Sequence, residues 1–227
     1  MVFSETVNDS GWRSRALDRT LASARARSVE RLERLLGAAR DLANETGSAG
    51  FTVQQVCARA GISLKGFYAC FPGKDELLVA LIEEDSRTGA QVLAELVDTH
   101  DDPEARVRAA VVGVFELLTI PGALGYAGVL LREHRRLTES HPAELRAALA
   151  PIIDLLETEL AAGARAGVVA SGDHARDALT VFALVLEGIH DVTVEGADPL
   201  EEAAYLWRFC SGGLRGAAPS THEGDLR

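Results

Sequence analysis

The segment AGISLKGFYACFP, from Ala60 to Pro72, holds residue types that can bind a nucleic acid. A helix that approaches phosphates or base edges needs small residues where its backbone comes close, a cation for charge, and an amphipathic aromatic ring that reaches the sugar-phosphate edge. Gly66, Lys65 and Tyr68 supply these three properties within the segment. We therefore interpret it as a candidate for DNA recognition.

Two short helices must position this segment. Thr52 stands where an N-cap is needed and Gln55 follows three residues later, which predicts a capping box and a helix that starts at Val53. Gly61 can adopt the left-handed conformation that closes this helix, and Ser63 can cap the next one. A sharp corner between two short helices is the geometry of a helix-turn-helix, whose second helix enters the major groove.

The spacing within the second helix separates a buried face from a free one. Phe67, Cys70 and Phe71 lie three and four positions apart and are expected to pack inward. The residues expected at the DNA are the capping residues, the free surface and the following lysine: Thr52, Ser63, Leu64, Lys65, Gly66, Tyr68, Ala69 and Lys74.

Lys74 opens the helix that follows Pro72 and Gly73, and there it opposes the helix dipole. A phosphate bound at that helix end by the lysine and by free backbone amides would explain this position. A solvated surface lysine is the alternative, and the sequence leaves both interpretations open.

The charge of the chain is divided unevenly. The formal net charge is -11, yet residues 1–76 carry 11 Lys and Arg against 9 Asp and Glu, whereas residues 77–227 carry 12 against 25. A mildly basic front joined to a strongly acidic rear is expected if only the front approaches a polyanion.

The composition excludes several classes of protein. Cys57, Cys70 and Cys210 are too few and too scattered for a disulfide framework, no CxxC pair indicates a metal site, and the N-terminus lacks a secretory signal, so a cytoplasmic protein is expected. Residues 109–131 are apolar over a length that could cross a bilayer, but Pro121 interrupts them. Two buried helices are expected there rather than a membrane span.

The chain is expected to be all-α, with an N-terminal three-helix helix-turn-helix domain and a larger helical domain. Apolar residues recur at helical spacing from Val29 to Trp207, and no convincing β-alternation occurs. The expected parts are a flexible N-terminal arm over residues 1–24, the helix-turn-helix domain over 25–73, the larger domain over 74–214 and a flexible tail over 215–227.

The fourth helix is expected to join the two domains. It is predicted to run from Lys74 toward Asp98. Its inward-facing residues are expected to be Leu77, Leu78, Leu81, Ile82, Val92 and Leu96.

The run FTVQQVCARAGISLKGFYACFPGKDELLVALIEE, from Phe51 to Glu84, resembles the DNA-binding signature of TetR-type (tetracycline-repressor-like) regulators. The resemblance covers roughly residues 28–84, and the rear half agrees only in being helical and of suitable length. It implies that Thr52 and Lys74 touch phosphate and that Leu64 and Lys65 read bases, while Tyr68 meets backbone or base.

Two positions depart from the pattern of this family. Gly66 stands where the family commonly has threonine, and Cys70 stands where it often has a polar histidine. Two side-chain contacts to phosphate that the family makes are therefore not implied for this chain.

The resemblance also implies partners for the whole chain. These are a double-stranded, palindromic operator DNA, a small-molecule effector and a second copy of the chain, with the larger domain serving ligand binding and dimerisation. The implied function is that of a ligand-responsive transcriptional regulator, with repression favoured over activation.

The resemblance implies a ligand cavity in the rear domain, and the scarcity of fixed cations there favours an apolar or weakly polar ligand over a small anion. Candidate lining residues are Phe115, Tyr126, Leu130, His134, Leu155, Phe182 and Leu186. The family pairs its last two helices across a two-fold axis, which implies the interface residues Phe182, Ile189, Leu200 and Trp207. The same apolar stripes could instead be intramolecular core.

Catalytic and metal-binding patterns are weak. Glu133, His134 and His141 do not form an HExxH motif, and His134 and His141 lie seven positions apart across an expected helix end, so no metal site is predicted. The sequence shows no nucleophile with a base, no phosphate loop and no dinucleotide fingerprint, and no cofactor is expected. The alternative function is a helical enzyme or a small-molecule carrier that uses its front domain only for packing.

Overall fold

The computed structural model describes residues 11–170 and 172–215, except for the side chain of Arg13. The described residues are mainly helical and contain no strand, which confirms the all-α prediction. The helices in chain order are α1 (Gly11–Thr46), α2 (Val53–Ala60), α3 (Leu64–Tyr68), α4 (Lys74–Asp98), α5 (Pro103–Leu118), α6 (Ala123–Ser140), α7 (Pro142–Arg165), α8 (His174–His190), a π-helical turn (Asp191–Glu195) and α9 (Pro199–Leu214).

Local sequence signals explain where the later helices begin. Asp102, Asp173 and Asp198 are the N-caps of α5, α8 and α9, and each side chain accepts a hydrogen bond from a backbone amide in the first turn. Proline occupies the first turn of α5, α7 and α9, where its missing N–H costs nothing.

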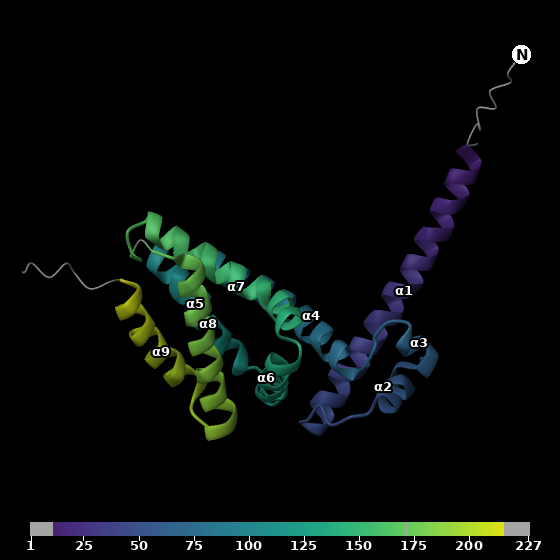
Figure 1. Ribbon diagram of the computed structural model, residues 1–227. Coiled ribbons are helices and arrows are strands. Elements are labelled where there is room, and N and C mark those ends of the chain that lie inside the picture. The colour runs from purple at the N-terminus through teal and green to yellow at the C-terminus, as the bar shows by residue number, and fades with distance from the viewer. Residues whose placement is uncertain (1–10, 171, 216–227) are drawn as a thin grey trace, which may run out of the picture.

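The helices surround two hydrophobic cores. One core lies between α1, α2, α3 and the first half of α4. Leu137, near the C-terminal end of α6, and Leu145, near the N-terminal end of α7, also pack into it. The other core lies between α5, α7, α8 and α9 and includes Val97 near the end of α4. Figure 1 shows α2 and α3 beside α1 at one end of the molecule and α8 and α9 at the other. α4 therefore belongs to both cores and joins the two domains, as predicted.

The first helix is longer than the sequence analysis expected. Residues 11–24 form its first turns, so the predicted flexible arm over 1–24 is wrong for these residues, and residues 1–10 lie outside the described part of the chain. Leu, Ala and Arg are good helix formers, and this stretch continues a helix that the first core already stabilises from Leu35 onward. The N-terminal part of α1 projects away from the other helices in Figure 1.

The buried face of α4 and the end of α9 agree only in part with the sequence-based expectation. Leu77, Leu78, Leu81 and Ile82 are buried as predicted, but the stripe continues through Leu93 rather than Val92, which is 39% exposed. The helical repeat places Leu93 on the same buried face as Ile82. The expected face was therefore wrong by one position at Val92. Of the predicted tail over 215–227, Arg215 caps the end of α9 and residues 216–227 lie outside the described part.

The apolar region around Pro121 forms two helices, as predicted. α5 ends at Leu118 and α6 starts at Ala123. Within the described residues no single helix is long and apolar enough to cross a membrane, and only α5 and α6 taken together would pass that criterion, although they are bent by 114° at their junction.

Candidate DNA-binding surface and ligand cavity

The capping box predicted at the start of α2 is present. Thr52 Oγ1 accepts a hydrogen bond from the amide of Gln55 at 3.2 Å, and Gln55 Oε1 accepts one from the amide of Thr52 at 2.7 Å. Gly61 closes α2 with a φ of 63°, and the amide of Ile62 donates to the carbonyl of Cys57 at 3.0 Å. These bonds fix the corner between α2 and α3.

Arg34 of α1 reinforces this corner in a way that the sequence analysis missed. Its Nη2 donates to the carbonyls of Ala60 and Gly61 at the end of α2. A cation is favourable at a helix C-terminus because the last carbonyls lack intrahelical partners. No local sequence signal links these residues, because the contact spans two helices.

The helix that follows presents the predicted surface. Ser63 Oγ accepts a hydrogen bond from the amide of Gly66 at 3.1 Å and caps α3. Phe67 is fully buried, whereas Leu64 and Tyr68 are 43% and 57% exposed. Lys65 and Ala69 are also exposed and Gly66 is half-buried, so the candidate DNA-reading residues lie together on the outer side of α3.

The structure gives Gly66 a packing role as well. A Cβ at this position would lie 2.8 Å from Cγ2 of Ile62. A side chain at position 66 would require Ile62 to move, so the glycine avoids a steric clash in the turn.

Lys74 has partners inside the protein. Its ammonium donates to the carbonyl of Ala49 and lies 4.9 Å from the centre of the Phe51 ring. The lysine therefore holds the segment that leads into Thr52. An ammonium has three donors, so this contact leaves donors for a phosphate at the start of α4.

We expect Lys74→Ala to weaken binding to all DNA sequences by a similar factor and to reduce the slope of log affinity against log salt by about one unit, because one phosphate contact is lost. The measurement is filter binding or fluorescence anisotropy over a salt series with operator and random duplexes. Thr52→Ala should also weaken both duplexes equally. An unchanged salt slope for Lys74→Ala would show that the lysine only holds the loop.

A cavity of about 230 Å³ lies in the larger domain. Residues of α4, α5, α6, α7 and α8 line it, and most of these side chains are aliphatic. Of the candidate ligand-binding residues, those that line the cavity are Leu130, His134, Phe182 and Leu186.

Three other candidates lie elsewhere. Phe115 is fully buried in the second core, and Leu155 is half-buried on α7 outside the set of lining residues. Tyr126 is a neighbour of the cavity, because its hydroxyl donates to Oδ2 of the lining residue Asp85. The helical period alone could not separate these positions, since residues on one apolar face can meet either a neighbouring helix or a cavity.

Asp85 connects three helices beside the cavity. Its Oδ1 accepts hydrogen bonds from Arg40 of α1, at 2.6 Å from Nη2 and 3.2 Å from Nε, while its Oδ2 accepts from Tyr126 of α6. Burial, together with the adjacent carboxylate, raises the pKa of the Tyr126 hydroxyl well above its usual range, so the hydroxyl remains a donor at neutral pH. The network joins the DNA-binding domain to the cavity wall.

α6 makes further contacts with the DNA-binding domain. Arg132 donates to the carbonyl of Gly47 at 2.7 Å, and Arg136 forms a bidentate pair with Asp75, at 2.7 and 3.0 Å, in the first turn of α4. The guanidinium of Arg136 holds the pKa of the Asp75 carboxyl below its usual value. α6 therefore touches both the cavity and the DNA-binding domain, a connection that the sequence analysis assigned to α4 alone.

The last two helices expose large apolar side chains. Leu179 of α8 and Leu200, Tyr205 and Phe209 of α9 are each at least 50% exposed. Tyr205 and Phe209 lie four positions apart on one side of α9, whereas Leu200, which was expected at the dimer interface, is exposed on another side of the helix, because it precedes them by five and nine positions.

The other expected interface residues lie toward the interior. Phe182 and Ile189 line the cavity, and Trp207 is half-buried beside Glu104 and Val107 of α5. For Phe182 and Ile189 the structure thus favours the alternative left open above, in which the apolar stripe of α8 lies within its own chain.

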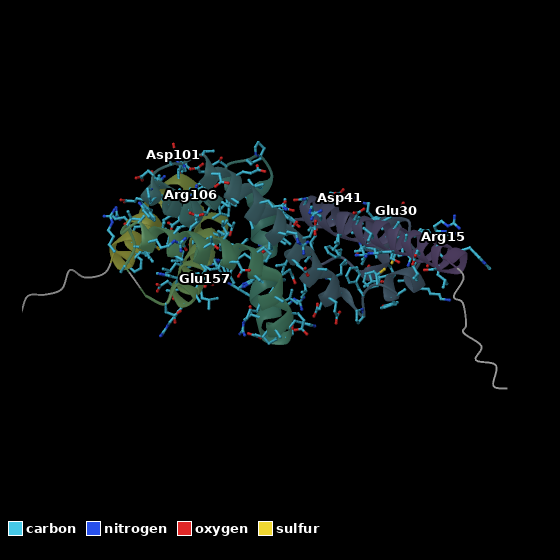
Figure 2. The ribbon with its side chains drawn as sticks, turned by 90° about the horizontal axis from the view of Figure 1, so that it is seen from above. Arg15, Glu30, Asp41, Asp101, Arg106 and Glu157 are labelled. Atoms are coloured by element: carbon cyan, nitrogen blue, oxygen red, sulfur yellow. The ribbon has the colours of Figure 1, made fainter. Side chains whose placement is uncertain are left out.

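Charged side chains of both signs lie at both ends of the molecule. Figure 2 shows Arg15, Glu30 and Asp41 spaced along α1, at the opposite end from Asp101, Arg106 and Glu157. Among the residues that the structure describes, no group of three or more His, Cys, Asp or Glu side chains is placed to hold a metal ion.

The fold and this surface define an all-α protein with an N-terminal helix-turn-helix and a helical domain that contains a cavity. Residues 35–81 match the sequence model of the family described as bacterial regulatory proteins, tetR family, which confirms the predicted TetR-type resemblance of the DNA-binding segment. A comparison with curated protein sequences gives no significant match.

Solved structures of such regulators share the fold. The transcriptional regulator FadR from Bacillus subtilis, in complex with stearoyl-CoA, is 18% identical, with a TM-score of 0.67 over 80% of this chain and 98% of that one. RolR in complex with resorcinol is 18% identical, with a TM-score of 0.62 over 84% and 93%. A TetR-family regulator from Pectobacterium atrosepticum is 24% identical, with a TM-score of 0.62 over 84% and 95%.

Proposed function

We propose that this chain is a homodimeric repressor that binds a palindromic operator DNA and leaves it when a small molecule fills the cavity. The observation that carries the proposal is the exposed face of α3 on a tightly capped helix-turn-helix, within the segment that matches the tetR family. The protein would act in the cytoplasm, where its operator is found, and it would not be an enzyme.

The direct test is a gel shift of the purified full-length protein with the DNA upstream of its own coding sequence. Retention of this DNA in the presence of excess random duplex supports a specific regulator. A helical enzyme or a small-molecule carrier with a front domain used only for packing would show no such retention.

The exposed face of α8 and α9 supports the homodimer. Two copies that pair Leu179, Tyr205 and Phe209 across a two-fold axis would cover large apolar side chains that a single chain leaves in water. Such a dimer would present two copies of α3 to a palindromic site, where half-sites lie about 34–36 Å apart.

The ligand cannot be taken from the similar structures, because RolR and FadR are described with molecules as different as resorcinol and stearoyl-CoA. The cavity of this chain has a mainly aliphatic wall and a volume of about 230 Å³. These features support a small, mainly apolar effector.

The signal would pass along two routes. A ligand that displaces α6 would strain the pair between Arg136 and Asp75, and a ligand that moves α4 would strain the bonds of Asp85 to Arg40 and Tyr126. Either change alters how the DNA-binding domain is held, and therefore the separation of the two recognition helices in the dimer.

We expect Asp85→Asn to weaken operator binding by roughly tenfold in the absence of ligand, because loss of the carboxylate frees Arg40 and loosens the hold on the DNA-binding domain. The measurement is fluorescence anisotropy with operator DNA, together with thermal unfolding to confirm that the protein remains folded.

Asp98→Asn is the matched control, since this carboxylate lies on the same helix and pairs with Arg106 far from the DNA-binding domain. The control should bind operator like the native protein. Equal affinity of the Asp85 variant and the control would remove this network from the signalling route.

A further inference from the structure

The cavity wall contains a buried hydroxyl without a partner. Ser86 of α4 is 4% exposed, and its Oγ has no hydrogen-bond partner among the residues that the structure describes. Other helical hydroxyls in the chain bond to the carbonyl four residues earlier, as Thr46, Thr88 and Thr138 do at 2.7, 3.0 and 2.8 Å. Ser86 is thus left with an unmet hydrogen bond at the cavity.

His134 contributes a second buried polar atom without a hydrogen-bond partner to the residues that line the cavity. Nδ1 of His134, on α6, is buried and has no partner within the described part of the chain. Burial, with a smaller contribution from Arg135, lowers the pKa of His134, so its ring is neutral at pH 7. A neutral imidazole offers one donor and one acceptor.

Unpaired buried polar atoms are unfavourable, and native proteins contain few of them. Ser86 and His134 lie on different helices, yet both line the same cavity. A polar group of a ligand that reached either atom would give it the partner that it lacks. The serine can turn its hydroxyl between staggered rotamers without any movement of α4.

The charged residues that line the cavity indicate whether the polar group of the ligand carries a charge. Among the described lining residues the one carboxylate is Asp85, whose oxygens are occupied by Arg40 and Tyr126, and no lysine or arginine lines the cavity. An anion would find no cation on the wall, because Arg40 is already paired with Asp85, and a cation would find no free carboxylate. The polar group is therefore uncharged.

The volume of the cavity limits the size of the ligand. An apolar cavity of about 150 Å³ can hold benzene, and this cavity measures about 230 Å³. The comparison indicates a ligand with on the order of ten non-hydrogen atoms. Leu130, Ile152, Phe182 and Leu186 would surround its apolar part.

We infer that the cavity binds an uncharged alcohol or phenol with a mainly apolar body, whose hydroxyl is hydrogen-bonded to Ser86 and His134. A hydroxyl both donates and accepts, so it matches a serine and a neutral histidine together. The inference rests on the proposed function, because it names the ligand class of the same effector cavity.

The test is calorimetric titration of the full-length protein with three matched probes: 4-propylphenol, propylbenzene and 4-propylbenzoate. The phenol is expected to bind roughly tenfold more tightly than propylbenzene, since it adds a hydrogen bond inside a desolvated site, and the benzoate is expected to bind most weakly.

Ser86→Ala and His134→Leu should each reduce the preference for the phenol several-fold while leaving the affinity for propylbenzene unchanged. Ser86→Ala should also leave the thermal stability of the ligand-free protein equal or higher, because it removes an unpaired buried hydroxyl. Thr88→Val is the matched control, since it removes a hydroxyl of the same helix that already has a partner, and it should bind all three probes like the native protein.

Equal affinities for the phenol and propylbenzene would overturn the inference and leave the effector cavity intact. A preference for the benzoate, or a phenol preference that neither variant changes, would also overturn it. If no probe binds while the protein still retains its operator DNA, the inference and the effector role of the cavity both fail, and the DNA-binding function remains.

Discussion

Phe209→Arg is expected to convert the protein to monomers and to lower its operator affinity by a factor of about 10² to 10⁴. Phe209 is 61% exposed on α9 and lies with Tyr205 and Leu179 on the face that we propose to form the dimer. Each of two paired copies would bury a charge there without a partner. A monomer engages one half-site, and the gain from linking two half-sites is lost.

Sedimentation velocity and anisotropy with operator DNA measure these two effects. Val92→Arg is the matched control, because Val92 is an exposed apolar residue of α4 and should tolerate a charge. A Phe209→Arg protein that remains dimeric and binds operator like the control would show that the subunits meet elsewhere. Trp207→Arg is expected instead to lower the melting temperature, since Trp207 packs against α5 within its own chain.

Lys65→Ala is expected to weaken specific operator binding by about 1–3 kcal/mol while affecting random DNA much less. Lys65 is exposed in the first turn of α3, where a recognition helix contacts base edges. Lys74, by contrast, also holds the segment that leads into Thr52. Leu64→Ala should act in the same direction through a lost apolar contact with the bases.

The measurement compares Kd values for operator and random duplexes at one salt concentration. Arg87→Ala is a suitable control, because Arg87 is an exposed cation on α4 that pairs with Glu83 and Glu84 outside the DNA-binding domain. If Lys65→Ala weakens operator and random DNA by the same factor, the lysine contacts phosphate and does not specify sequence.

The sequence predicted the DNA-binding half in detail because its signals are local. The capping box at Thr52, the left-handed Gly61 and the cap at Ser63 act within a few residues, and each fixes a helix boundary by its own hydrogen bonds. Burial of Phe67 beside exposed Tyr68 then follows from the helical period.

The rear half was predicted less well because its features depend on contacts between distant helices. Periodicity marked Phe182 and Ile189 as apolar positions of α8, but it could not tell a dimer face from a cavity wall. The network around Asp85 joins residues 41 and 45 positions apart, so no pattern of spacing reveals it. Ser86 is ordinary in sequence, and its unmet hydrogen bond is visible only in three dimensions.

On the proposed mechanism, the cavity ligand and the operator DNA weaken each other's binding. α4 and α6 both line the cavity; Asp85 ties α4 to Arg40 of α1, and Arg132 ties α6 to the carbonyl of Gly47. If filling the cavity changes how that domain is held, the two binding events must weaken each other by the same factor.

The most direct measurement is the calorimetric affinity of a cavity ligand, with 4-propylphenol as the first probe, for the free protein and for the protein saturated with operator DNA. The proposed mechanism predicts an affinity about 5 to 150 times weaker in the presence of DNA, and operator affinity that falls by the same factor when the ligand is saturating. A cavity ligand that binds with the same affinity in the presence and absence of operator DNA would contradict the proposal that the rear domain controls DNA binding.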